Sequence, residues 1–382
     1  MSAKICLVVT TISDGFFLDA YANKLIEEEM TKDAVIIVIP DRKSPPQLFE
    51  KCKQLGQQGI RVMCPTLEAQ DQFLSKLGGI QHITPYNSNE RRTVGFLMAL
   101  EVGCEFLITI DDDNFCRGNE SFFAEHIAMM EDTQEFEVVH SHNGWFNICD
   151  MMEIVPDYRV YARGFPYSKH YDNAKVVYPM DYTTESGLIK MNAGLWLAEP
   201  DLDSITWLVA PVKAKSFNGE SLVLGEDAWS PINTQNTALH RDVIVSYYYV
   251  RMDYPLAGIP IDRYGDIFSG YFSQAVIRHM GHRIRVGSPI VDHDRNTHDF
   301  MQDAYRELAC IWVLEDLLEW LPGAKLEGST YEEAYISLSY AIEDIVEQFS
   351  GFIWTDASRG YFHQMAHRMR TWVKAVRIIE GK

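Results

Sequence analysis

Leu107-Ile108-Thr109-Ile110-Asp111-Asp112-Asp113-Asn114-Phe115 is the stretch of this chain that decides its fold. An apolar and β-branched run ends abruptly in three carboxylates, which predicts a buried strand with acidic side chains at its C-terminal tip. Ligands of open α/β sheets bind at such tips. Two carboxylates one residue apart can bind one divalent cation and leave positions for phosphate oxygens. The stretch therefore suits a Mg²⁺- or Mn²⁺-dependent site for a nucleotide diphosphate, although acidic triplets also occur in ordinary surface loops.

The composition is that of an ordinary globular protein of 382 residues, with 47% hydrophobic and 23% charged residues. No stretch approaches the roughly 18 apolar residues of a membrane span, and the N-terminus has no signal-peptide pattern. We therefore expect a cytoplasmic protein. The net charge of −20 repels nucleic acid unless a local basic patch reverses it. Seven scattered cysteines form no C-x-x-C pair, which argues against a zinc or disulfide framework.

Strand and helix signals alternate over residues 1–120, an order that predicts a parallel sheet covered on both faces. Neither a G-x-G-x-x-G dinucleotide motif nor a P-loop motif is present. The predicted strands span residues 5–10, 34–39, 60–64 and 106–110, and the predicted helices span residues 16–30, 45–55 and 91–102.

Residues 121–300 are expected to continue this sheet, with long loops over the metal site. Amphipathic segments then predict a C-terminal helical extension that packs on the core, with an interaction or oligomerisation surface as the alternative. The expected domains are a nucleotide-binding domain at 1–300 and the extension at 301–382. The predicted strands here span residues 137–141, 188–197, 243–250 and 283–286, and the predicted helices span residues 267–280, 301–321, 331–349 and 361–379.

Five segments, in order, resemble the reversibly glycosylated polypeptides, the family of the plant UDP-arabinopyranose mutases. They are Ile-Asp-Asp-Asp at 110–113, Ala-Arg-Gly-Phe-Pro-Tyr-Ser at 162–168, Gly-Leu-Trp-Leu at 194–197, Pro-Ile-Asp-Arg-Tyr-Gly-Asp-Ile at 260–267 and Val-Asp-His at 291–293. The resemblance covers roughly residues 3–300 and leaves the C-terminal helices outside it. It implies an α/β fold of GT-A type: a mostly parallel, Rossmann-like sheet with helices on both faces, a UDP-sugar substrate and Mn²⁺ or Mg²⁺.

Asp111 and Asp113 are the expected metal ligands, because alternation along a strand places both on one face. Asp112 would then point elsewhere, toward the ribose hydroxyls. In GT-A enzymes a distant histidine often supplies a third ligand, and His293 is the candidate here. An ordinary polar loop histidine is the alternative for this position.

Arg163 lies in the second segment, where the family's arginine is linked to self-glycosylation and mutase activity. A guanidinium can instead clamp a diphosphate or contact the sugar, and we favour this catalytic role because guanidinium is a poor nucleophile. A structural loop arginine is the alternative. The family carries a second arginine just after this segment, where this chain has Lys169 and His170.

The fourth segment carries two further catalytic candidates in a loop that opens a helix. Asp266 can act as general base or orient the sugar, and its alternative role is a helix cap. Asp262 is the other candidate, and Arg263 between them is expected to contact the nucleotide.

The nucleotide end is expected over the first strands. Thr10 and Thr11 end strand one, and Asp41 follows strand two, where a carboxylate can accept from uracil or ribose. Arg92 matches an arginine of the family and can reach phosphate. Turn and surface roles explain Asp41 and Arg92 nearly as well.

The predicted function is metal-dependent transfer of a sugar, such as a pentose, from UDP to an unidentified small molecule, polysaccharide, protein or nucleic acid. The alternative is a mutase that interconverts the pyranose and furanose forms of UDP-arabinose. The missing second arginine and the added helices favour the transferase, while Arg163 favours the mutase. A non-catalytic scaffold that binds sugar nucleotide is the second alternative. A nucleic-acid acceptor would require a basic face formed by Arg359, His363, His367, Arg368, Arg370, Lys374 and Arg377, for which a solvated helix face is the simpler explanation.

Overall fold

The fold is described from a computed structural model, which covers residues 3–118, 120–170, 180–252 and 254–382. Its N-terminal half alternates strands and helices, because continuous apolar runs bury strands on both faces and amphipathic runs cover them. The strands are β1 (Ile5–Thr11), β2 (Ala34–Pro40), β3 (Val62–Met63) and β4 (Phe106–Ile110), and the helices are α1 (Leu18–Glu27), α2 (Pro46–Gln57), α3 (Leu67–Ser75) and α4 (Arg92–Val102).

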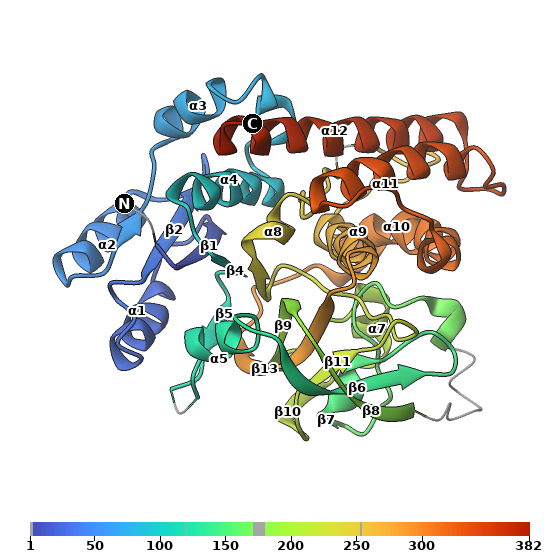
Figure 1. Cartoon of the computed structure of the whole chain (residues 1–382), viewed down its shortest axis with the longest axis horizontal. Coiled ribbons are helices and arrows are strands. Elements are labelled where there is room, and N and C mark those ends of the chain that lie inside the picture. The colour runs from blue at the N-terminus through green and yellow to red at the C-terminus, as the bar shows by residue number, and fades with distance from the viewer. Residues whose placement is uncertain (1–2, 119, 171–179, 253) are drawn as a thin grey trace.

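These strands form the parallel part of the sheet, in the order β3-β2-β1-β4. Figure 1 shows α4 above and α1 below them, so both faces are covered. Because the strands run parallel, β1 and β4 end at the same edge of the sheet, with Thr11 next to the aspartates at 111–113.

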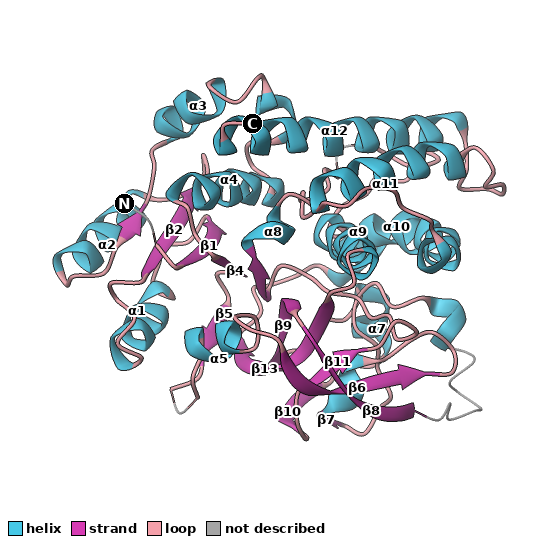
Figure 2. Cartoon of the chain, in the orientation of Figure 1, coloured by secondary structure: helices cyan, strands magenta, loops and turns pink. Residues whose placement is uncertain are grey.

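Beyond β4 the sheet continues with strands of mixed direction. The order onward from β4 is β12-β9-β13-β11-β6-β8, which gives a single sheet of 13 strands within the described residues. Figure 2 shows these strands below and to the right of the parallel part. The strands are β5 (Asn114–Cys116), β6 (Gln134–Ser141), β7 (Met152–Val155), β8 (Met180–Gly187), β9 (Ile189–Ala198), β10 (Lys213–Phe217), β11 (Leu222–Leu224), β12 (Asn236–His240) and β13 (Arg283–His293).

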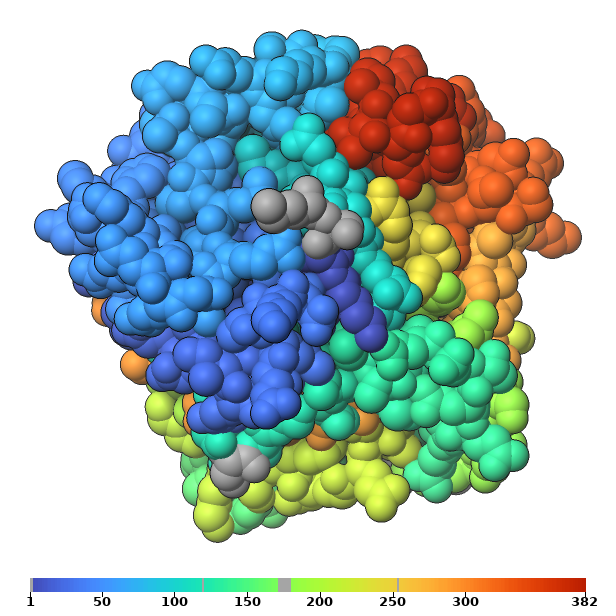
Figure 3. Space-filling view, turned by 60° about the vertical axis from the view of Figure 1, so that its left-hand side comes forward, coloured from blue at the N-terminus to red at the C-terminus, as the bar shows by residue number. Residues whose placement is uncertain are grey.

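The remaining helices pack around this sheet. They are α5 (Phe123–Ala128), α7 (Ser204–Val209), α8 (Arg241–Ile244), α9 (Gly265–His279), α10 (Phe300–Trp320), α11 (Tyr331–Val346) and α12 (Asp356–Glu380), with short 3₁₀ turns at Ile80–Ile83, Asn89–Arg91, Ile148–Met151 and Leu321–Gly323. Helix α12 lies along α4 and the segment after α3 (Figures 1 and 3), and Trp372 is buried there with its Nε1 donating to the Val245 carbonyl at 3.0 Å.

The α/β class, the helices on both faces and the C-terminal helical extension of the predicted fold are confirmed. The strand predicted at 243–250 is wrong. Part of this segment belongs to α8, and the rest is turn and irregular backbone whose polar groups are satisfied by both backbone and side-chain groups. Ser269 Oγ donates to the Tyr248 carbonyl at 2.6 Å and accepts from the Val250 amide at 3.1 Å. These contacts replace a strand ladder, so a buried apolar run here needs no neighbouring strand.

The basic residues of α12 do not form a free cationic face. His363 lies 2.7 Å from Glu347, Arg370 lies 2.7 Å from Glu343, and Arg377 pairs with Glu332. The acidic partners come from α11 or directly follow it, so α11 and α12 compensate each other's charge. Among the described residues, no helix combines the length and apolar character that crossing a bilayer requires.

Candidate active site

Two adjoining cavities lie at the sheet edge where β1 and β4 end, and together they are lined by every predicted site residue. The first has a volume of about 220 Å³ and the second about 930 Å³. They share Thr10, Asn89, Asp112 and Asn296. Of the predicted residues, the first cavity is lined by Thr10, Arg92, Asp111, Asp112, Asp113, Arg163, Arg263, Asp266 and His293, and the second by Thr10, Thr11, Asp41, Asp112 and Asp262.

The three consecutive aspartates point to three different partners. Strand β4 ends at Ile110 and the chain turns at once, so the alternation expected to place Asp111 and Asp113 on one face does not apply. Asp111 forms an ion pair with Arg92, Asp112 accepts a hydrogen bond from the Thr11 hydroxyl, and Asp113 faces His293. Within the described residues, no cluster of three acidic, histidine or cysteine side chains is arranged to hold a metal.

Asp113 and His293 nevertheless form a pair suited to a cation. Strands β5 and β13 pair antiparallel with Asn114 opposite His293, and this register places His293 Nε2 3.5 Å from Asp113 Oδ2. The other ring nitrogen, Nδ1, lies 2.5 Å from the Glu199 carbonyl, to which it can only donate. Burial alone would lower the pKa of His293, but Asp113 outweighs burial and raises it, so Nε2 holds a proton toward that carboxylate. A cation bound between the two would take the place of this proton.

The electrostatics of the aspartates show that negative charge is concentrated here. Burial, with the neighbouring charges of Asp113 and Asp111, raises the pKa of Asp112 to about 6 despite the hydrogen bond from Thr11. Burial also raises the pKa of Asp111, although Arg92 opposes that shift. For Asp113 burial acts in the same direction, but His293 outweighs it and lowers the pKa. A divalent cation between Asp113 and His293 would relieve this repulsion, so the residues present fit one.

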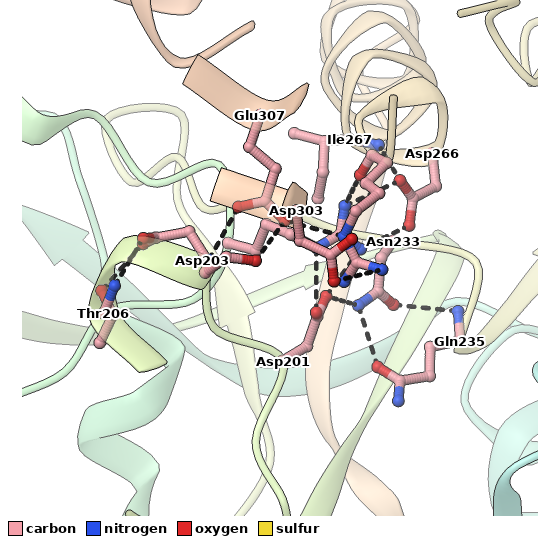
Figure 4. A network of polar contacts seen from close by, with 12 residues as sticks. Asp201, Asp203, Thr206, Asn233, Gln235, Asp266, Ile267, Asp303 and Glu307 are labelled. Atoms are coloured by element: carbon pink, nitrogen blue, oxygen red, sulfur yellow. Dashed lines mark hydrogen bonds and ion pairs between the residues drawn. The ribbon is translucent and has the colours of Figure 1, made fainter. Parts of the chain in front are cut away.

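Arg163 is buried between two carboxylates and uses all of its N–H donors within the protein. Nε and Nη2 donate to Asp201 at 2.9 and 3.0 Å, while Nη2 and Nη1 donate to Asp266 at 2.9 and 3.2 Å. Nη1 also donates to the Arg263 carbonyl. Figure 4 shows Asp201 and Asp266 approaching this centre from different elements. The geometry favours a positioning role for Arg163 over the predicted diphosphate clamp, because no donor remains for a ligand.

Asp201 is the partner that holds this arrangement. Burial alone would raise its pKa, but Arg163, with Arg295 and Asn233, outweighs burial and lowers it to about 2. Asn233 Nδ2 donates to Asp201 Oδ2 at 2.6 Å, and Asn233 Oδ1 accepts from the Gln235 amide at 3.0 Å (Figure 4). Asp201 therefore stays ionised and links the Arg163 loop to the segment that precedes β12.

The loop that opens α9 divides its predicted residues between the cavities. Asp262 lines only the second cavity, half exposed, with Arg306 Nη1 3.7 Å from its Oδ2. Arg263 lines the first cavity and adopts a positive φ of 68°, while its Nε donates to Glu307 at 2.8 Å. Glu307 belongs to α10, is fully buried and also accepts from the Ser204 amide at 2.8 Å. Asp266 is not the N-cap of α9, a position that Tyr264 occupies.

At the nucleotide end, Asp41 is buried and accepts from the Ser88 amide at 3.3 Å. Arg92 Nη1 donates to Thr109, to the Ile110 carbonyl and to the Thr234 carbonyl at 2.7 to 3.0 Å, so it ties β4 to the segment before β12. Its contact with Asp111 is its one link to the acidic cluster. The predicted phosphate contact of Arg92 therefore competes with a structural role.

Several cavity residues were not predicted from the sequence, namely Asn89, Asp201, Gln235, Tyr249, Arg295, Asn296 and His298. Arg295, Asn296 and His298 directly follow the Val-Asp-His segment, and that adjacency was a usable signal. Asp201 follows the Gly-Leu-Trp-Leu segment at the end of β9, where a carboxylate at a strand tip was again a usable signal. No sequence feature marked Gln235 or Tyr249.

Comparison with known proteins identifies the family. The family model described as reversibly glycosylated polypeptide matches residues 67–380. The chain belongs to this family. The match includes α10, α11 and α12, so the expectation that the C-terminal helices lie outside the resemblance is wrong. The short motifs that carried the resemblance all precede residue 300.

Individual relatives agree with this assignment. UDP-arabinopyranose mutase 1 of Arabidopsis thaliana is 24% identical over 290 residues, covering 74% of this chain and 71% of its own. Probable UDP-arabinopyranose mutase 4 of the same plant is 24% identical and covers 93% of each chain. Among solved structures, glucosyl-3-phosphoglycerate synthase from Mycobacterium tuberculosis with Mg²⁺ and UDP aligns with a TM-score of 0.39 and 11% identity, covering 82% of this chain and 79% of its own. A mannosyltransferase from Pyrobaculum calidifontis with GDP-Man and Mn²⁺ aligns with a TM-score of 0.36 and 9% identity, covering 100% of this chain and 88% of its own.

Proposed function

We propose that this chain is an enzyme that binds a UDP-sugar with a divalent cation and interconverts the pyranose and furanose forms of a UDP-pentose. The observation that carries the proposal is the pairing of Asp113 with His293 beside a larger cavity, in a chain whose relatives are named UDP-arabinopyranose mutases. The family match over α10 to α12 removes one of the two reasons for placing the transferase first.

Asp113 and His293 would hold Mn²⁺ or Mg²⁺, with Asp111 close by in the same cavity. When bound, the cation would neutralise charge on the diphosphate as the sugar leaves. Asn296 Nδ2 donates to Asp113 Oδ2 at 3.2 Å and Asn114 Nδ2 donates to Oδ1 at 3.0 Å, so the carboxylate is held in one orientation. Asp111 needs to exchange part of its contact with Arg92 to become a third ligand.

The second cavity would take the nucleoside. It adjoins the cation site through Thr10 and Asp112, and its volume of about 930 Å³ gives ample room for a uridine. The Asp112 carboxylate, already hydrogen-bonded to Thr11, would accept from a ribose hydroxyl. Asp41, at the tip of β2, would lie near the base, and Asp262 lines the same cavity.

The sugar would then lie in the first cavity, against Asp266 and Arg263. In the mutase reaction, the bond between the anomeric carbon and the phosphate oxygen breaks and its electron pair stays on the diphosphate. The O4 hydroxyl then bonds to the anomeric carbon and gives up its proton, the bond between that carbon and O5 breaks, and O5 takes up a proton. The same diphosphate oxygen re-forms its bond to the anomeric carbon. Asp266 Oδ2 receives one hydrogen bond, from Arg163, and keeps a lone pair that can accept from a sugar hydroxyl.

A transferase that passes the sugar to an external acceptor is the second candidate, favoured by one structural observation. Where the family carries a second arginine, His170 stacks against Tyr161 with ring centroids 3.9 Å apart and against Tyr167 at 4.4 Å. Burial lowers the pKa of His170 to about 4, so this position holds a neutral ring at pH 7. His170 therefore supplies no positive charge at pH 7, although Lys169 precedes it in the same region.

Incubation with UDP-arabinopyranose and Mn²⁺, without acceptor, separates these candidates. We expect UDP-arabinofuranose, detected by chromatography of the nucleotide sugars. Slow release of free UDP without furanose would favour the transferase. Binding of the sugar nucleotide without any turnover would favour the non-catalytic scaffold, and failure to bind any nucleoside diphosphate in the presence of Mn²⁺ would refute the proposal.

Asp113→Asn tests the cation site. It removes the charge that faces His293, and we expect turnover to fall by about 100-fold or more, the scale of losing one transition-state electrostatic contact. Asp292→Asn is the matched control, because Asp292 neighbours His293 but is 55% exposed and pairs only loosely with Arg117, at 3.6 Å. Equal activity of both variants would contradict the assignment of Asp113.

The C-terminal helices as an association surface remain a proposal. Met301, Tyr305 and Trp312 are exposed on α10, and Phe352 contacts Trp312 with ring centroids 5.5 Å apart. Light scattering of the purified chain, compared with Trp312→Ser, tests whether copies associate through this face. A cytoplasmic location likewise stays a prediction from the sequence.

A further inference from the structure

Arg295 lies in the first cavity with an unused hydrogen-bonding group. It follows His293 by two residues, in the segment between β13 and α10. Its Nη1 is buried and has no hydrogen-bond partner among the described residues, and no carboxylate there lies within ion-pair distance of its guanidinium. Buried donors in folded proteins are nearly always paired, so an unpaired one that lines a cavity marks a position where a ligand or water can accept a hydrogen bond.

The other three arginines of this cavity are already engaged by carboxylates. Arg92 pairs with Asp111, Arg163 lies between two aspartates, and Arg263 donates to Glu307. Arg295 is therefore the one arginine lining this cavity that forms no ion pair with a described carboxylate, although Asp201 interacts with its charge at longer range. Its positive charge is available to an anion that enters the cavity.

Two aromatic rings hold the Arg295 side chain in place. Trp207 and Phe300 stack with centroids 5.7 Å apart and planes 10° from parallel. The guanidinium carbon of Arg295 lies 5.2 Å from the centroid of each ring. Such contacts favour the cation and restrict its rotamers, so less conformational freedom is lost when it binds a ligand.

We propose that Arg295 binds the sugar-bearing phosphate of the sugar nucleotide's diphosphate, in the cavity that Asp113 and His293 also line. This inference rests on the proposed function and names the residue that would hold the leaving group. When the bond from the anomeric carbon to the phosphate oxygen breaks, its electron pair stays on that oxygen, and Arg295 donates hydrogen bonds to the resulting phosphate. A planar guanidinium suits this task because it can donate two parallel hydrogen bonds to phosphate oxygens.

Titration calorimetry in the presence of Mn²⁺ tests this assignment with three probes: UDP, UMP and inorganic pyrophosphate. Arg295→Gln should weaken UDP and pyrophosphate by about 10- to 100-fold, the range for a hydrogen bond to a charged group, and change UMP by less than about threefold. Arg117→Gln is the control, because Arg117 lies outside both cavities and pairs with Glu120 at 2.6 Å; it should change none of the three.

Equal weakening of UMP and UDP by Arg295→Gln, or no weakening of either, would overturn the assignment. Arg295→Lys keeps the charge and removes the paired donors. If Arg295→Gln does not fold, Arg295→Lys must still weaken the binding of UDP more than the binding of UMP. Failure of the proposed function gives a different result. In that case the wild-type protein binds no UDP but still binds pyrophosphate, and this binding depends on Arg295. If the wild-type protein binds neither UDP nor pyrophosphate, the assignment of Arg295 is overturned together with the proposed function.

Discussion

Arg163→Met is the substitution that separates a positioning arginine from a reactive one. Arg163 is 7% exposed, and its guanidinium contacts Asp201 and Asp266, which are themselves buried. Removing it leaves two carboxylates in a buried setting without their shared counter-charge. Breaking a buried ion pair in this way costs about 3–5 kcal/mol, so we expect the free energy of unfolding to fall by that amount at pH 7.

The pH dependence of this loss identifies its cause. The pKa of Asp201 is held at about 2, below its ordinary value of 3.8, so this carboxylate contributes about 2 kcal/mol of stability. That contribution is present above about pH 4 and is lost as the pH falls toward 2, because the unfolded chain takes up the proton first. In Arg163→Met only Arg295 and Asn233 still oppose burial, so the pKa of Asp201 rises and the deficit of the variant should shrink at pH 4.

Urea unfolding followed by tryptophan fluorescence measures both quantities at pH 7 and pH 4. Arg159→Met is the control on the same loop, since Arg159 is 39% exposed and pairs with Asp150 at 3.1 Å. An exposed pair contributes about 0–1 kcal/mol, so this variant should lose little at either pH. The reasoning is refuted if Arg163→Met loses no more than the control, or if its deficit is unchanged at pH 4.

Three further predictions concern other parts of the molecule. Burial lowers the pKa of His126 to about 3, so the unfolded chain takes up a proton that the folded chain resists. The free energy of unfolding should therefore fall as the pH drops below about 6.5, by about 2 kcal/mol at pH 5. His126→Gln should remove this pH dependence in urea titrations. Gly270→Ala should destabilise the protein by about 1–3 kcal/mol, because its Cβ would lie 1.9 Å from the Ile232 carbonyl oxygen. Gly360→Ala places its Cβ in open space on α12 and should stabilise the protein by up to about 1 kcal/mol. Thermal unfolding measures both changes. Mn²⁺ should raise the melting temperature of the UDP-bound protein, chelation should reverse this, and Asp113→Asn should show no such shift.

The sequence was most informative where burial was uniform. Strands β1, β2 and β4 are buried along nearly their whole length, so continuous apolar runs predicted them closely. The run at 243–250 is also apolar, but Ser269 and Trp372 donate hydrogen bonds to two of its backbone carbonyls. A local sequence pattern cannot predict hydrogen-bond partners that are so distant in the sequence. An apolar run therefore predicts burial more reliably than it predicts a strand.

The same limit applies to the site. Residue types at strand ends predicted a set of side chains that does line one pair of cavities. The number of hydrogen-bond donors that a side chain has left for a ligand depends on its partners in the fold. Arg163 matched a family motif but is fully engaged by Asp201 and Asp266, whereas Arg295 matched no quoted motif and keeps a free donor. A motif identifies a position, and only the contacts show whether that position faces a ligand or the protein.

The C-terminal helices show how such contacts link site residues to segments that are distant in the sequence. Glu307 of α10 accepts from Arg263 Nε and from Ser204, so the loop that opens α9 is fixed by a helix some forty residues later. His298, in the segment before α10, lies 3.3 Å from Arg263 Nη1 and 2.8 Å from Asp303. Since Arg295 lies in that same segment and contacts the ring of Phe300 at the start of α10, the helix also orients the guanidinium that we propose binds the diphosphate. Contacts from α10 therefore orient residues that line the first cavity, across the domain boundary predicted at residue 300.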